Sequence, residues 1–247
     1  MPALLELVHI HKRFGRVIVA DDVSLSIDAG AAVGIVGPNG AGKTSLFGII
    51  SGDLRPDAGE IRFDGSVVNR LDPARRCRLG IGRTYQVPQP FERMTVFENV
   101  LVAAQQGGRA RAQDSYDRAA SALRRTELLA HANRPAGSLG LLDRKRLELA
   151  RALATEPRIL LLDEVAGGLT EPEMRQLVEI VQAIRAEGTA IVWIEHVVRA
   201  LVAAVDRLVC LAGGTFIGDG PPREVLESAA VREVYLGTEE LAIGGSA

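Results

Sequence analysis

Few aromatic residues, few cysteines and no long apolar run characterise this chain of 247 residues. Aromatic side chains make up only 4% of a sequence that is 47% hydrophobic, so the core must be mainly aliphatic. No apolar run approaches the ~18 residues that a membrane-spanning helix needs, and the N-terminus lacks a basic segment followed by a long apolar stretch. We therefore expect no transmembrane helix and no signal peptide, so any link to a membrane must come through a partner chain.

The net charge and the cysteine content limit the possible binding partners and the cellular compartment of the protein. The formal charge of -2 at pH 7 gives no basic excess of the kind that nucleic-acid-binding domains carry, so we expect no nucleic-acid partner. The two cysteines, Cys77 and Cys210, lie far apart and have neither a metal-ligand nor a C-x-x-C spacing. They are expected to be reduced thiols of a cytoplasmic protein.

What the chain does contain is an alternation of apolar runs and helical segments, which favours an α/β layered fold. Val23 to Ile27 alternates with period 2, and a turn at Pro56 to Gly59 leads into another short strand. These early strands are predicted to be antiparallel, because their connections are too short for a crossover helix. The later runs that are typical of buried strands span residues 31–36, 159–162, 190–194 and 208–211.

The middle of the chain is helical instead. Thr95 and Glu98 have the spacing of a capping box, which predicts the start of a helix. Gly188 closes the helix expected over residues 171–187, which lies between the later predicted strands. Further helices are expected over residues 114–129, 145–155 and 171–187.

Residues Gly37 to Thr44 form a glycine-rich loop between a predicted strand and a predicted helix. They fit G-x-x-x-x-G-K-[ST], a pattern that wraps nucleotide phosphates. Glycines let backbone N–H groups point at the β-phosphate, and the following helix adds its partial positive charge. Lys43 is expected to reach the β- and γ-phosphates, and the Thr44 hydroxyl to ligate Mg²⁺. The nucleotide-binding residues predicted here are Gly37, Pro38, Asn39, Gly40, Ala41, Gly42, Lys43, Thr44 and Ser45.

A second element of a nucleotide site is the aliphatic run that ends in Asp163 and Glu164. A buried strand with an acid at its carboxyl end suits Mg²⁺-nucleotide chemistry. Asp163 is predicted to hold the Mg²⁺ shell, and Glu164 to orient or deprotonate the attacking water. Alone, such a pair of acids is more often a solvated strand end than part of a nucleotide site. The glycine loop upstream makes the nucleotide site the better interpretation.

The glycine loop, the strand that ends in Asp163 and Glu164, and several further segments together resemble the ATP-binding subunit of ABC transporters. The resemblance covers nearly the whole chain. The resemblance implies that Phe14 stacks on adenine, that Gln86 touches Mg²⁺ and senses a membrane subunit, and that His196 contacts the γ-phosphate. Arg146 to Leu153 is similar to the helix after the family signature. Each residue alone has a plainer interpretation, as a core aromatic, a loop amide or a structural histidine.

The resemblance implies a P-loop NTPase fold of ABC ATPase type, with a RecA-like core, an antiparallel β subdomain and a helical subdomain. Residues 1–86 and 157–247 are assigned to the core with its β subdomain, and 87–156 to the helical subdomain, within a single domain. ATP and Mg²⁺ are the implied cofactors. The implied catalytic residues are Lys43, Gln86, Glu164 and His196, and the implied Mg²⁺ ligands are Thr44, Gln86 and Asp163.

Within that family, several phrases resemble the branched-chain amino acid import group. They are Arg83 to Gln86, Met94 to Ala103, Ile194 to His196 and Val234 to Gly237. The resemblance implies an ATPase at the cytoplasmic face of the inner (plasma) membrane, with two membrane-spanning permease subunits and an extracytoplasmic solute-binding protein. The substrate then is a branched-chain amino acid or a related small polar solute. The lipopolysaccharide-export ATPase shares some of these phrases and stays open as an alternative.

One segment departs from the family pattern. The signature is usually Leu-Ser-Gly-Gly-Gln, and this chain has in its place the residues Leu139, Gly140, Leu141, Leu142 and Asp143. The serine hydroxyl is missing, and Leu142 is expected to crowd the γ-phosphate held by the opposite subunit, where glycine allows close approach. Val165 also replaces a usual proline, and Thr170 a usual aspartate or asparagine.

This departure has unequal consequences, because each composite site of an ABC dimer joins the glycine loop of one chain to the signature of the other. The composite site built on this chain's glycine loop can hydrolyse ATP if a partner supplies a complete signature. The altered signature of this chain is expected to weaken the site built on the partner's loop. We therefore expect a second, different ABC ATPase subunit.

Two other functions stay open as interpretations of the sequence. They are a regulatory subunit that hydrolyses ATP weakly and an ABC ATPase of translation or DNA repair. A small GTPase is disfavoured because no Asn-Lys-x-Asp motif is present.

Two surface features complete the sequence-based predictions. Val87 to Glu98 follows Gln86 directly and is the expected docking surface for a membrane subunit. The arginines of a middle cluster are candidates for contact with lipid or a membrane subunit, but a solvated helical face is the better expectation. They are Arg109, Arg111, Arg118, Arg124 and Arg125.

Overall fold

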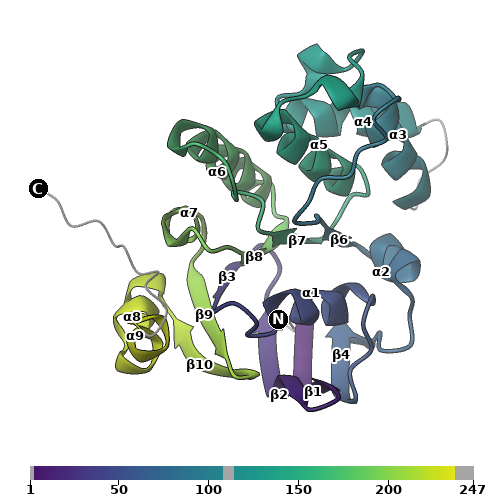
Figure 1. The fold of residues 1–247 in the computed structure, drawn as a ribbon. Helices are drawn as coiled ribbons and strands as arrows, with labels where there is room; N and C mark the ends of the chain where they lie inside the picture. Colours follow the sequence, from purple (N-terminus) through teal and green to yellow (C-terminus); the bar gives the residue numbers. More distant parts are fainter. Residues whose placement is uncertain (1–2, 108–113, 237–247) are drawn as a thin grey trace, which may run out of the picture.

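The computed structural model describes residues 3–107 and 114–236, and the structural statements below concern these ranges. A four-stranded antiparallel sheet at one end has the order β2-β1-β4-β5 (Figure 1). The predicted antiparallel sheet is confirmed, because β2 and β4 each pair antiparallel with β1. The predicted short connection was wrong, since residues 28–57 between β2 and β4 contain a strand of the second sheet and a helix. The strands are β1 (Leu5–Phe14), β2 (Val17–Ile27), β4 (Ala58–Phe63) and β5 (Ser66–Val67).

The second sheet has six strands in the order β10-β9-β3-β8-β7-β6. Its strands are parallel except β10, which is antiparallel to β9. Every residue of β3, β7 and β8 is buried, as their aliphatic runs predict. The strands are β3 (Ala32–Val36), β6 (Ile81–Arg83), β7 (Ile159–Asp163), β8 (Ala190–Ile194), β9 (Arg207–Ala212) and β10 (Thr215–Gly220).

The predicted helices are present with shifted boundaries, and the helix expected over residues 114–129 ends at Arg125. The predicted capping box is confirmed, since Thr95 N donates to Glu98 Oε2 at 2.7 Å and Glu98 N donates to Thr95 Oγ1 at 3.1 Å. The prediction of a helix starting at residue 145 was wrong, because α5 begins at Leu141, where the extended backbone of Gly140 serves as its N-cap. The helices are α1 (Lys43–Ser51), α2 (Pro73–Leu79), α3 (Val96–Gly107), α4 (Ser115–Arg125), α5 (Leu141–Leu153), α6 (Glu171–Ala186), α7 (Val198–Ala204), α8 (Pro222–Glu227) and α9 (Ala229–Leu236).

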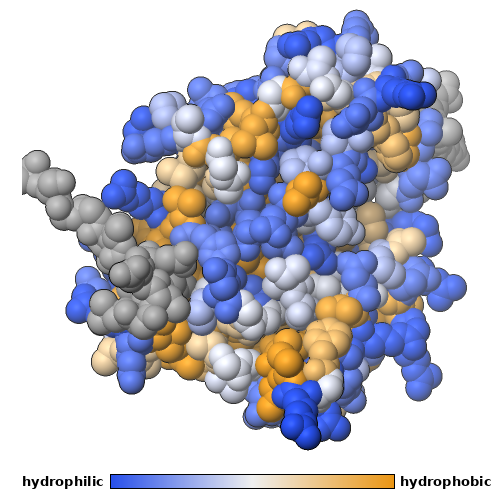
Figure 2. Space-filling model, in the orientation of Figure 1, coloured by the Kyte–Doolittle hydropathy of each residue, from blue (hydrophilic) through white to orange (hydrophobic). Residues whose placement is uncertain are grey.

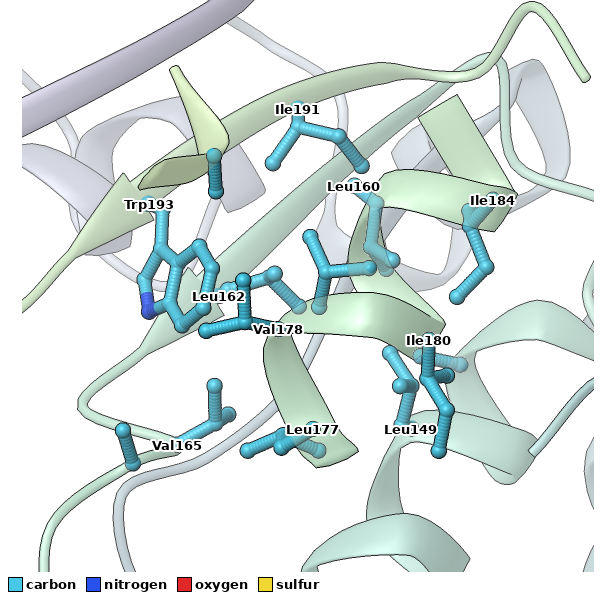
Figure 3. Packing of buried hydrophobic residues seen from close by; sticks show 14 of the residues in the cluster. Leu149, Leu160, Leu162, Val165, Leu177, Val178, Ile180, Ile184, Ile191 and Trp193 are labelled. Carbon is cyan, nitrogen blue, oxygen red and sulfur yellow. The ribbon is translucent and has the colours of Figure 1, made fainter. Parts of the chain in front are cut away.

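Two hydrophobic clusters lie on opposite faces of the six-stranded sheet. On one face, α1 lies between this sheet and the antiparallel sheet (Figure 1). On the other face, α5, α6 and α7 pack against β7, β8 and β9. Figure 3 shows the second cluster, in which Leu160, Leu162 and Trp193 of the sheet meet Val178 of α6. The core is mainly aliphatic as predicted, and Trp193 is its largest fully buried side chain.

Within the described ranges, no helix is long and apolar enough to cross a membrane. Of the arginine cluster, Arg109 and Arg111 lie outside the described residues. Arg118 pairs with Glu156 at 3.5 Å, and Arg125 pairs with Glu187 at 2.6 Å.

The two thiols are expected to differ in reactivity. Cys210 on β9 is fully buried, and burial raises the pKa of its thiol to about 11. Burial also raises the pKa of Cys77, but this residue on α2 is only half-buried. A raised pKa lowers the thiolate fraction at a given pH, and the thiolate is the reactive form. At mildly alkaline pH, we expect iodoacetamide to modify Cys77 slowly and Cys210 only after denaturation.

Intact-mass measurement on the folded protein and on its Cys77→Ser variant checks this difference. The variant is expected to gain no adduct until denaturant is added. Modification of the folded variant would contradict the burial of Cys210.

Candidate nucleotide site

Four loops meet at one edge of the six-stranded sheet. They follow the carboxyl ends of β3, β8, β7 and β6, which are neighbours in the sheet. In parallel sheets this edge is where ligands bind. A pocket of about 270 Å³ opens there, and it combines the glycine loop with two of the predicted catalytic side chains. Its lining residues are Val19, Asn39, Gly40, Gly42, Lys43, Thr44, Ser45, Glu164 and His196.

The glycine loop is shaped by close backbone contacts. A Cβ on Gly37 would lie 2.0 Å from the main-chain oxygen of Leu211, and a Cβ on Gly42 would lie 2.4 Å from that of Val19. Both glycines also have positive φ angles, 154° and 101°. No other residue fits these positions without moving the neighbouring strands. The buried Lys43 Nζ donates to the main-chain oxygens of Gly37 at 2.6 Å and Pro38 at 3.0 Å, so the loop curls around the ammonium group.

Helix α1 begins directly at the end of this loop. Gly42 is its N-cap and provides no side-chain hydrogen bond, and the first turn contains no acidic residue. The positive end of the helix dipole and the exposed hydroxyl of Thr44 therefore face the pocket without a competing carboxylate on this helix. This arrangement suits an anion such as a phosphate group.

Glu164 is the centre of a three-residue contact beside the pocket. Its Oε1 lies 2.8 Å from His196 Nε2, and its Oε2 accepts a hydrogen bond from Gln86 Nε2. The structure thus brings together these three residues, which the sequence places on three separate loops. Glu164 has a φ of 49°, a left-handed conformation that is uncommon outside glycine. Such backbone strain is frequent at functional sites.

Asp163 lies behind Glu164 and is almost fully buried, with a side chain that is 2% exposed. Its Oδ2 lies 2.9 Å from Arg83 Nη2, and its Oδ1 is buried without a hydrogen-bond partner among the described residues. Burial raises the pKa of Asp163, whereas the Arg83 hydrogen bond lowers it. A buried carboxylate oxygen without a partner is unusual, and it fits a site for hydrated Mg²⁺.

Three residues of the site were not predicted from the sequence. Arg83 links Asp163 to Ser51 and Asp53, with 3.0 Å contacts from its Nη1 to both. Glu195 is buried, and its Oε1 accepts from Ala166 N at 2.5 Å, so it ties the loop after β7 to the loop after β8. Burial raises the pKa of Glu195. Lys145 of α5 contacts the loop after β6 and the loop after β7. In the sequence, the only signal for these three residues was a charge within a segment that is otherwise apolar or assigned to catalysis.

Phe14 does not line the pocket. It is the last residue of β1, is 47% exposed, and has Lys12 Nζ at 5.2 Å from its ring centre. Figure 2 shows apolar surface around this end of β1 and β2, where Val17 and Ile18 are also exposed. Its assignment to adenine therefore stays a prediction.

The segment in place of the family signature, residues 139–143, lies at the start of α5 and outside the pocket of its own chain. Leu141 is 45% exposed, whereas Leu142 packs partly against the core. Asp143 pairs with His131 at 3.2 Å and with Arg146 at 3.6 Å. A Cβ on Gly140 would meet no atom within 4 Å.

The fold and the pocket together define a P-loop nucleotide-binding ATPase. The ABC transporter family matches residues 20–167, more than half of the chain. A crystal structure of an ATP-binding cassette of an ABC transporter in its ADP conformation is 29% identical, with a TM-score of 0.88 over 96% of this chain and 100% of that one. The chain belongs to the ABC transporter family and is an ATP-binding subunit that hydrolyses ATP.

Three curated relatives are similar over almost their full length. The high-affinity branched-chain amino acid transport ATP-binding protein LivG of Salmonella typhimurium is 36% identical over 95% of this chain and 98% of the relative. The corresponding protein BraF of Pseudomonas aeruginosa is 33% identical over the same shares. The lipopolysaccharide export system ATP-binding protein LptB of Escherichia coli is 32% identical over 96% of this chain and 98% of the relative.

Proposed function

We propose that this chain hydrolyses ATP to drive import of branched-chain amino acids or related small polar solutes. The observation that carries the hydrolysis step is the Glu164 carboxylate beside the glycine-loop pocket, within hydrogen-bonding distance of Gln86 and His196. The similarity to LivG and BraF, which are branched-chain amino acid transport ATP-binding proteins, supports the substrate class.

In this proposal the residues of one chain divide the chemistry between them. The glycine loop and Lys43 hold the phosphates, and Phe14 contacts the adenine. Glu164 orients the attacking water and accepts its proton, while His196 contacts the γ-phosphate. Thr44, Gln86 and Asp163 would hold Mg²⁺, and the unpartnered Oδ1 of Asp163 fits that assignment. Bound Mg²⁺ supplies neutralisation of phosphate charge.

The proposed assembly contains two membrane-spanning permease subunits, an extracytoplasmic solute-binding protein and the chain at the cytoplasmic face of the inner membrane. We assign permease docking to residues 87–98, in the helical subdomain formed by residues 87–156 between the two parts of the core. Val87 and Phe91 are exposed there, at 65% and 48%. The first half of the segment is held in place, since Asn99 bonds the backbone of Phe91 and Arg151 Nη1 donates to Gln89 O at 3.0 Å.

The second ATPase subunit in this assembly is proposed to be a different chain. Residues 139–143 lack the serine and the second glycine of the family signature, so two copies of this chain would carry the same defect at both composite sites. A partner with a sound signature would complete the site built on this chain's own glycine loop.

Lipopolysaccharide export is the second candidate, because the similarity to LptB is nearly as extensive. The two candidates differ in substrate and direction, which transport measurements separate. Proteoliposomes that contain the chain with its permease and partner ATPase subunits, with the binding protein outside and ATP inside, are expected to accumulate labelled leucine. A Glu164→Gln chain serves as the control and should give no accumulation. Lipid A extraction without leucine uptake would favour export instead.

A further inference from the structure

Lys145 is a buried cation that joins two loops of the nucleotide site. It lies on α5, and only 4% of the residue is exposed. Its Nζ donates to the main-chain oxygen of Gln86 at 3.2 Å and to that of Glu164 at 3.1 Å. These two residues follow different strands, β6 and β7, and their side chains meet beside the pocket. One side chain of the helical region therefore holds the backbone of both loops.

The surroundings of Lys145 indicate that its hydrogen bonds matter. Burial lowers the pKa of Lys145, while the carboxylates of Glu195 and Glu164 raise it. A buried ammonium group is costly unless its donors find partners, and the two carbonyl oxygens are such partners. A methionine would fill similar space without that cost but could not hold either loop.

Glu164 is a residue whose backbone needs such support. Its left-handed φ of 49° is a conformation that persists only when the surroundings hold it. Its carbonyl oxygen accepts from Lys145 and, at 3.3 Å, from Gly167 N. The orientation of this peptide sets the direction in which the Glu164 side chain leaves the backbone, and therefore its position beside the pocket.

We propose that Lys145 is a positioning residue for ATP hydrolysis, which places the Glu164 carboxylate by holding the carbonyl groups of Gln86 and Glu164. This inference rests on the proposed role of Glu164 in hydrolysis. Lys145 also stands one helical turn after Leu141, at the start of α5. A shift of the 139–143 segment against the partner subunit would thereby reach the catalytic carboxylate through the Lys145 side chain.

The test compares Lys145→Met, which keeps the length but not the donors, with Lys145→Gln, which keeps a neutral donor. Arg76→Met on α2 is the matched control, because Arg76 is also a buried cation, and its Nη1 donates to the main-chain oxygens of Ile49 at 2.6 Å and Ile50 at 2.9 Å, which do not line the pocket. In the assembled transporter, Lys145→Met is expected to lower kcat on the order of 10- to 100-fold, as small misplacements of a catalytic group do. KM for ATP is expected to stay within about twofold, since the glycine loop is unchanged.

Partial recovery of kcat in Lys145→Gln, with little change in Arg76→Met, is the expected pattern. The same substitution is also made in a Glu164→Gln chain and followed by single-turnover hydrolysis, where it should have no further effect. An unchanged kcat in folded Lys145→Met, or additive losses in the double variant, would overturn the inference. If Lys145→Met does not fold, the comparison of Lys145→Gln in the two backgrounds decides. Normal hydrolysis by Glu164→Gln alone would instead remove the proposed role of Glu164.

Discussion

Replacing Glu164 with glutamine is expected to lower ATP hydrolysis at least about 100-fold while ATP binding is retained. A positioned general base contributes about 10²- to 10⁴-fold to a rate, and the amide cannot accept the proton from water. The shape of the side chain is unchanged, and it can still meet Gln86 and His196 across the contacts that hold it now. The pocket formed by the glycine loop should therefore keep its affinity for nucleotide.

Steady-state phosphate release and binding of a fluorescent ATP analogue, measured side by side, check this expectation. Glu179→Gln on α6 is the matched control, because it removes an exposed carboxylate that does not line the pocket. A Glu164→Gln rate within threefold of the wild-type rate would show that the carboxylate is not the base. A wild type without measurable hydrolysis would instead support the interpretation as a weakly hydrolysing regulatory subunit.

Restoring the family signature is expected to raise hydrolysis by this chain alone about tenfold or more. The double variant Gly140→Ser/Leu142→Gly supplies the missing hydroxyl and the missing close approach. A Cβ at position 140 meets open space, so the serine fits and can also cap α5. One donor to a developing negative charge is worth about 10²- to 10³-fold, so even an imperfect restoration should be measurable. Because Leu142 packs partly against the core, Tm should fall.

The measurement is ATP hydrolysis against protein concentration for the wild type, the double variant and Leu142→Ala. Leu142→Ala shortens the side chain and keeps the Cβ, so it reports the cost of lost packing without the glycine. A nearly silent wild type and an active double variant would support a partner ATPase with a sound signature. A wild type that already turns over briskly would mean that the chain forms a working homodimer and that Leu142 does not block the site.

The strands and the phosphate loop could be predicted because their signals are local. Aliphatic runs placed β7 and β8 correctly, and the spacing of Gly37, Gly42 and Lys43 identified the loop that the structure shows closed around Lys43. The resemblance to a family supplied Gln86 and His196, which lie far apart in sequence and meet at Glu164.

The contacts that support the site were not predictable in the same way. Lys145 and Arg83 act through main-chain oxygens or through a carboxylate that lies far away in sequence, and no spacing rule describes such partners. The start of α5 was misplaced because the periodicity of its apolar residues begins after the 139–143 segment. The position of Phe14 relative to the pocket depends on how β1 and β2 end, which the alternation of residues does not specify.

The burial of α1 has a mechanical consequence. All of its residues except Thr44 and Ser45 are buried, between two sheets that hold it from both sides (Figure 1). A phosphate bound at the start of this helix would therefore be anchored to an element that is packed from two sides. We therefore expect displacements during the catalytic cycle to be larger in the peripheral helices α3, α4 and α5 than around the bound phosphate.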